Sequence, residues 1–142
     1  MTIKIVAISD THSMHRQVSV PDGDILVHAG DMSGHGSWPE FIDFAEWLDN
    51  QPHTHKVFVF GNHDGYDVKK CKNYLSANHP SLKLLYNEPA DIAGLKFWGS
   101  PFTPEFCDWY FMKDRGNDLA QIWNMMPPGT DVLVTHGPAY GH

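Results

Sequence analysis

The stretch Lys56-Val57-Phe58-Val59-Phe60-Gly61-Asn62-His63-Asp64 joins a strand pattern to a polar loop. Its first part, residues 56–60, is apolar after the lysine, as in a strand buried within a sheet. The glycine that follows lets the backbone turn tightly and approach other parts of the chain closely. An amide, an imidazole and a carboxylate come next. The stretch therefore predicts a buried strand whose end carries side chains able to do chemistry.

Three further segments repeat this arrangement of a strand pattern followed by polar residues. Residues 3–9, 25–29 and 131–135 are mostly apolar and β-branched, as in strands buried on both faces, and each opens into a loop. The loops supply these side chains: Asp10, His12, Asp31 and His136. Because the carboxyl ends of parallel strands lie along one rim of an α/β sheet, we expect these side chains to converge with Asn62.

Helical patterns alternate with the strands. Phe41, Phe44 and Leu48 recur at helical spacing, and Ser37 with Glu40 predicts a capping box before them. Other predicted elements are helices over 69–77 and 118–126 and short strands over 82–86 and 95–98, with a turn at 87–89 between these strands. The alternation indicates an α/β fold with a mainly parallel sheet and right-handed crossovers. Residues 1–142 are expected to form one domain, because no linker or internal repeat interrupts them.

Composition limits the classes of function. The chain has 142 residues and is 42% hydrophobic, which is enough for one globular core. Its formal net charge of −7, without a basic cluster, argues against non-specific binding to nucleic acid or to a membrane surface. No apolar run approaches the roughly 18 residues of a membrane span. The chain enters a strand within its first residues, which leaves no room for a signal peptide, so we expect a cytoplasmic location.

The side chains expected at the rim suit divalent cations. Asp10 and His12 are two residues apart, so on an extended strand end they would share one side and chelate one ion. Asp31 adds a carboxylate, which can bridge two cations about 3.5–4 Å apart, as in two-metal hydrolases. Asn62 offers an uncharged oxygen, and His136 is another imidazole at a strand end. Carboxylate, imidazole and amide ligands together suit Mn²⁺, Fe or Zn²⁺. We therefore predict a metal-dependent hydrolase with two divalent ions.

His63 and Asp64 are the candidate catalytic pair. A histidine beside a carboxylate is suited to act as general acid or as an electrophilic stabiliser, with its pKa raised by the neighbour. The alternatives for His63 are a further metal ligand or a turn residue.

One segment is crowded with aromatic residues: Phe102, Phe106, Trp109, Tyr110 and Phe111. At helical spacing they would belong to the core. The prolines among them favour instead a loop packed over the site, able to stack on a base or an aryl group.

The ordered motifs resemble those of the calcineurin-like metallophosphoesterase superfamily, which run D-x-H, G-D, G-N-H-D/E, H and finally G-H-x-H. The matching residues are Asp10 and His12, Gly30-Asp31, Gly61-Asn62-His63-Asp64, and His136. Residues 98–101, 106–109 and 135–138 resemble the metallophosphoesterase-domain brain-protein branch of this superfamily.

This resemblance implies a metallophosphoesterase-type αβ sandwich of two mixed sheets with flanking helices and a dinuclear metal site. It implies that Asp10 and His12 bind the first metal, Asp31 bridges, and Asn62 and His136 bind the second. His63 would contact the scissile phosphate or protonate the leaving alkoxide, with Asp64 orienting it.

The closing G-H-x-H motif is the point of departure from this pattern. The chain stops six residues after His136, at His142, which we interpret as an upstream histidine of the branch rather than a ligand. The expectation is thus a C-terminally truncated domain in which each metal lacks one histidine, with weak occupancy and impaired activity.

The strand at 131–135 would then be an open edge. We expect a homodimer or higher assembly to cover it, with His142 as a candidate ligand across the interface; the alternative is a monomer in which residues 137–142 or the aromatic segment fold over the edge.

The function expected from these residues is hydrolysis of phosphoesters, with phosphodiesters, including cyclic nucleotides, favoured over phosphoproteins. The expected partner is a small phosphoester substrate, without membrane or nucleic acid. Two other functions stay open. One is a degenerate, catalytically weak fold used for protein binding. The other is a nuclease on short nucleic acids, against which the acidic charge argues.

Overall fold

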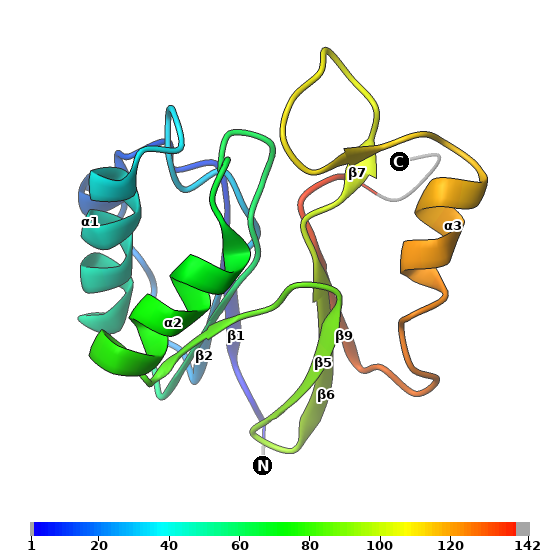
Figure 1. Ribbon diagram of the computed structural model, residues 1–142. Helices are drawn as coiled ribbons and strands as arrows, with labels where there is room; N and C mark the ends of the chain where they lie inside the picture. Colours follow the sequence, from blue (N-terminus) through cyan, green and yellow to red (C-terminus); the bar gives the residue numbers. More distant parts are fainter. Residues whose placement is uncertain (1, 139–142) are drawn as a thin grey trace.

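The computed structural model describes residues 2–138, so His142 lies outside the described residues. A four-stranded sheet forms its centre. The strands β1 (Ile5–Ile8), β2 (Ile25–His28), β3 (His55–Phe58) and β4 (Leu82–Leu84) pair in this order, all in parallel. A 3₁₀ helix, η1 (His15–Gln17), follows the first of them. Helices α1 (Trp38–Asp49) and α2 (Val68–Asn78) cover one face of this sheet (Figure 1).

Helix α1 begins where the sequence predicted it. Ser37 is its N-cap, and the capping box with Glu40 is present. The apolar side of the helix, with Phe41, Phe44 and Leu48, is fully buried in a cluster with residues of the sheet. The helical spacing and the cap together therefore fix both the start of α1 and the face that it turns to the sheet.

A second sheet lies against the other face of the first one. Its strands are β5 (Glu88–Ile92), β6 (Leu95–Ser100) and β9 (Val132–Thr135); β5 and β6 are antiparallel, whereas β6 and β9 are parallel. The two sheets share one apolar cluster, in which Val27 and Val57 of the first sheet meet Phe97 and Val134 of the second.

Helix α3 (Asn117–Trp123) covers the outer face of the second sheet, where Trp123 packs edge-on against Trp98 with ring centroids 5.9 Å apart. Two short strands, β7 (Thr103–Pro104) and β8 (Met112–Lys113), pair beside it. The layers run helices, sheet, sheet, helix (Figure 1), which confirms the predicted α/β sandwich. Within residues 2–138, no helix combines the length and apolar character needed to cross a bilayer.

The structure differs from the sequence expectations in three details. The first sheet is wholly parallel rather than mixed. Strand β1 is an edge strand with Ile5 37% exposed, so it is not buried on both faces. Residues predicted as a turn form the start of β5, where Pro89 is tolerated because an edge strand does not need every backbone donor.

Candidate metal centre

The loops that leave β1, β2, β3 and β9 meet at one end of the sandwich. They bring together two groups of side chains, His12 with Asp31 and His63, and Asp10 with Asp31 and His136. In each group, the atoms that could bind a metal lie within 4.8 Å of one another. Asn62 joins the second group, since its Oδ1 lies 3.0 Å from Nε2 of His136. All five residues predicted as metal ligands therefore converge, and His63 is next to them.

Asp31 is the side chain common to both groups. Its Oδ2 atom lies 3.8 Å from Nε2 of His12 and 4.0 Å from Nε2 of His63. Its Oδ1 atom lies 3.4 Å from Nε2 of His136 and accepts a hydrogen bond from the backbone of His63. Burial alone would raise the pKa of Asp31, but the neighbouring His136 and His63 donors lower it below its ordinary value. Each oxygen of one carboxylate thus faces a different group, as expected of a bridging ligand.

Backbone carbonyls hold the Nδ1 atoms of the three imidazoles. The Nδ1 atoms of His12, His63 and His136 lie 3.2, 3.0 and 2.9 Å from the carbonyl oxygens of Ser33, Gly34 and Ala29, respectively. A carbonyl only accepts hydrogen bonds, so Nδ1 carries a proton in each ring. The Nε2 atoms therefore face Asp31, as in histidines that bind metal through Nε2.

His136 is strongly influenced by its acidic neighbours. Burial alone would lower the pKa of His136, but hydrogen bonds to Asp31 and to the Ala29 carbonyl raise it to about 9. A cation bound at Nε2 would replace the proton held there. The location already favours positive charge, which is a property of a cation site.

The backbone of the site loops has an unusual conformation at three of the predicted ligands. Asp10, His12 and Asp31 have φ of 56°, 42° and 55°, in the left-handed region that few non-glycine residues adopt. The chain after β1 is therefore not extended, and the rule that residues i and i+2 share one side does not hold there. Among the potential ligand atoms, Asp10 is grouped with Asp31 and His136, and His12 with Asp31 and His63. Strained backbone of this kind is concentrated at functional sites.

Gly61 allows the loops after β2 and β3 to touch, as its position before Asn62 predicted. A Cβ atom at Gly61 would lie 2.2 Å from Oδ1 of Asp31 and 2.4 Å from its backbone nitrogen. Any side chain at this position would push the bridging carboxylate away.

Asp64 holds the loops, not the imidazole of His63. Its buried carboxylate accepts hydrogen bonds from the backbone nitrogens of Gly61 (2.8 Å) and Ser33 (3.0 Å) and from Oγ of Ser33 (2.6 Å). The ring of His63 is held instead by the carbonyl of Gly34. The expectation that Asp64 orients the His63 ring directly is therefore wrong; Asp64 fixes the turn on which His63 stands.

Glu40 supports the site in a way that the sequence did not reveal. Beyond its capping box, it accepts hydrogen bonds through Oε1 from Oγ of Ser13 (2.8 Å) and from the backbone of Gly34 (2.9 Å). Partial burial alone would raise the pKa of Glu40. These hydrogen bonds and those from Ser37 outweigh that effect and lower the pKa to about 2. The capping motif was visible in the sequence, whereas its link to two site loops depends on the tertiary fold.

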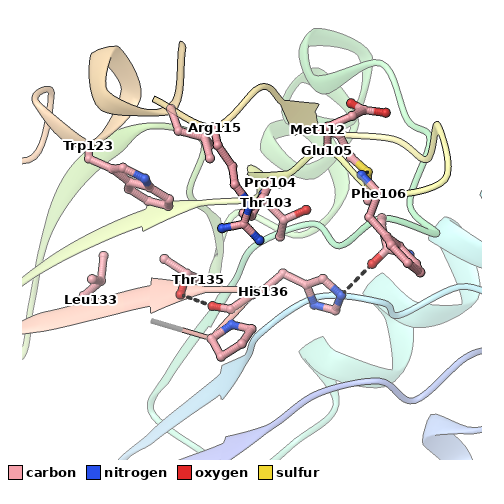
Figure 2. Close-up of a pocket in the computed structure, with 14 residues that line it drawn as sticks. Thr103, Pro104, Glu105, Phe106, Met112, Arg115, Trp123, Leu133, Thr135 and His136 are labelled. Atoms are coloured by element: carbon pink, nitrogen blue, oxygen red, sulfur yellow. Dashed lines mark hydrogen bonds between the residues drawn. The ribbon is translucent and has the colours of Figure 1, made fainter. Parts of the chain in front are cut away.

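A cavity of about 970 Å³ opens beside the second group, at Asn62 and His136. Figure 2 shows His136 at its floor and the guanidinium of Arg115 projecting into it. Much of the remaining lining is apolar, and includes Phe106, Leu119, Trp123 and Leu133.

Fold, motifs and site agree with the comparison to known proteins. The family model of the calcineurin-like phosphoesterases matches residues 3–142, and the chain belongs to this family, whose members generally bind divalent metals.

Among its relatives, metallophosphoesterase domain-containing protein 1 of Homo sapiens is 34% identical over 160 residues, covering 97% of this chain and 49% of that protein. The protein of the same name from Mus musculus gives the same values. A UPF0046 protein of Caenorhabditis elegans is 35% identical over 153 residues, covering 99% of this chain and 52% of that protein. The chain thus spans about half the length of these relatives.

Proposed function

We propose that this chain is a metal-dependent phosphoesterase that hydrolyses phosphodiesters, including cyclic nucleotides, or phosphomonoesters at a dinuclear site. The observation that carries the proposal is the position of Asp31, whose two carboxylate oxygens face the Nε2 atoms of two different proposed ligands, Oδ2 that of His12 and Oδ1 that of His136. The proposed metal ligands are Asp10, His12, Asp31, Asn62 and His136.

The donor set fits two divalent cations of intermediate hardness. It combines carboxylate oxygens, one amide oxygen and imidazole nitrogens, which suits Mn²⁺, Fe or Zn²⁺. The backbone carbonyls that hold the Nδ1 protons leave each Nε2 available. Two cations bound there would lower the pKa of a water molecule and neutralise charge on the phosphoryl oxygens.

His63 is proposed to protonate the leaving group. Its Nδ1 proton is held by the Gly34 carbonyl, so Nε2 is the atom that faces the site. When the ring is doubly protonated, Nε2 can give its proton to a departing alkoxide, which leaves the neutral imidazole with its proton on Nδ1. Asp64 acts as a positioning residue, because its hydrogen bonds fix the turn from Gly61 to His63. The same Nε2 atom would contact a phosphoryl oxygen in the ground state.

The surroundings favour a small ester over a polymer. The cavity at Asn62 and His136 offers apolar surface for the organic part of a substrate and one guanidinium for an anionic part. The net charge of −7 argues against a nucleic-acid strand.

Metal analysis combined with hydrolysis of an aryl phosphodiester tests the proposal. The protein is loaded separately with Mn²⁺, Fe²⁺ or Zn²⁺, and bound metal and release of nitrophenolate from bis(p-nitrophenyl) phosphate are measured. Metal-dependent hydrolysis that is lost in Asp31→Asn and kept in Asp43→Asn, a surface carboxylate bonded to Arg16, supports it. Absence of both metal and hydrolysis in all three preparations would contradict it and favour the protein-binding alternative.

A further inference from the structure

Three aromatic side chains stand exposed on one segment beside the candidate metal centre. Phe106, Trp109 and Tyr110 are 67%, 41% and 55% exposed, and all lie between β7 and β8. In Figure 1 this segment, drawn in yellow, arches above the end of the sandwich at which the site loops meet. A contiguous group of exposed aromatic residues marks a binding surface more often than a neutral part of the surface.

The segment is fixed to the loop that carries Asn62 and His63. The ring of Phe111 stacks on Phe60 of the core, with centroids 5.6 Å apart and 12° between the planes. The backbone nitrogen of Tyr110 donates to the carbonyl of Asn62. The Tyr110 ring covers Gly65 so closely that a Cβ atom there would lie 2.3 Å from it. The segment therefore has a defined position relative to His63.

Backbone strain is also present in this segment. Cys107, Asp108 and Phe111 have φ of 53°, 53° and 54°. Such conformations persist where the surrounding contacts determine them, which here are the contacts of Tyr110 and Phe111.

Trp109 is the residue that this arrangement brings to the site. Its ring centroid lies 4.4 Å from that of His63, with 38° between the planes. His63 in turn packs edge-on against His12, with centroids 4.7 Å apart. The indole is thus in direct contact with the proposed proton donor and keeps an exposed surface for a further group.

We propose that Trp109 determines substrate specificity by stacking on a planar aromatic group attached to the phosphoryl group, either an aryl ring or a nucleobase. This inference rests on the proposed function, which places the leaving group at His63. A group within hydrogen-bonding reach of Nε2 of His63 lies next to the indole. Aromatic pairs stack with centroids roughly 4.5–7 Å apart, and Trp109 is 41% exposed. An alkyl group at the same place gains no such contact.

Binding of matched ligands to the Mn²⁺-loaded protein tests the inference by calorimetry. One arm compares phenylphosphonate with methylphosphonate; the other compares adenosine 5′-monophosphate with ribose 5-phosphate. We expect the aromatic ligand to bind about tenfold more tightly in at least one arm, as expected of one stacked ring. Trp109→Ala should reduce that preference to about twofold or less, and Trp109→Phe should keep most of it. The arm with the preference identifies aryl or nucleobase as the group recognised.

Tyr110→Phe is the matched control, because Tyr110 is an exposed aromatic residue of the same segment and this change keeps the ring that covers Gly65. A preference that is missing from the unmodified protein, survives Trp109→Ala or is lost instead in Tyr110→Phe overturns the inference. The proposed function is tested separately. A preference that depends on Trp109 in a protein that hydrolyses no ester would refute the enzymatic proposal alone, and hydrolysis without the preference would refute this inference alone.

Discussion

Nε2 of His136 lies 3.4 Å from Oδ1 of Asp31, although His136 follows β9 of the second sheet and Asp31 follows β2 of the first. The contact joins the two halves of the sandwich at the candidate metal centre.

Replacing the shared carboxylate should affect both groups of ligands. We expect Asp31→Asn to weaken metal binding by more than the roughly 10–100-fold cost of losing a supporting hydrogen bond. Dialysis against metal buffers followed by elemental analysis measures this. Asp43→Asn serves as control. Equal metal content in Asp31→Asn and in the unmodified protein would show that Asp31 is not a ligand.

His63 is expected to act in the reaction and not in metal retention. His63→Ala should keep the bound metal while slowing phosphodiester hydrolysis by about 10²–10⁴-fold, the usual contribution of general acid–base catalysis. Its Nε2 atom lies 4.0 Å from Oδ2 of Asp31, so the structure allows both roles. Loss of metal from a folded His63→Ala protein would make His63 a ligand and contradict the role proposed here.

Glu40 should give the fold a pH-dependent contribution to stability. Folding lowers its pKa from 4.5 to about 2, so the folded state favours the ionised form. The contribution is complete above about pH 4.5 and is lost as the pH falls towards 2. Glu40→Gln should therefore lower the free energy of unfolding by about 1–2 kcal/mol at pH 7, and by progressively less below pH 4.5.

Urea unfolding between pH 7 and 3 measures this difference. Glu46→Gln, a change of an exposed glutamate on the same helix, should have little effect at any pH. If the loss of unfolding free energy in Glu40→Gln stays constant down to pH 3, the ionised form of Glu40 is not the source of the stabilisation.

Residue patterns predicted the elements and the convergence of the candidate ligands, but not the details that tertiary contacts decide. The capping box of Ser37 and Glu40 and the strands before Asp31 and Asn62 depend on local sequence, and the structure contains them. The grouping of Asp10 with His136, and of His12 with His63, involves left-handed backbone in a loop that is bonded to the next loop, and no spacing rule shows it.

Two further details were hidden for the same reason. The carbonyl of Gly34 that holds His63 belongs to the backbone, so no residue type signals it. The sequence predicts a turn at Pro89, because the place of this residue at a sheet edge is known only once the sheet order is known.

The edge strand β9 is expected to pair with a second copy of the chain. Within residues 2–138 no strand pairs with its outer edge, and Leu133 on this strand is 51% exposed. Open edges of this kind pair readily with other strands. Light scattering at low micromolar concentration should give about twice the chain mass of 16.1 kDa. Leu133→Lys should shift the mass to that of the monomer, whereas a monomeric unmodified protein would refute the assembly.

The origin of the ligands in two sheets has a further consequence. Asp10, His12, Asp31 and Asn62 all stand on loops that leave the first sheet, whereas His136 alone of the proposed ligands stands on the second. A cation shared by Asp31 and His136 would act as a cross-link between the sheets, in addition to the packing of Val57 against Phe97 and Val134. Chelation should then speed amide hydrogen exchange in β6 and β9 before it affects β2 and β3, since a ligand that bridges two units stabilises their docking. The metal would then stabilise the contact between the two sheets in addition to its proposed role in hydrolysis.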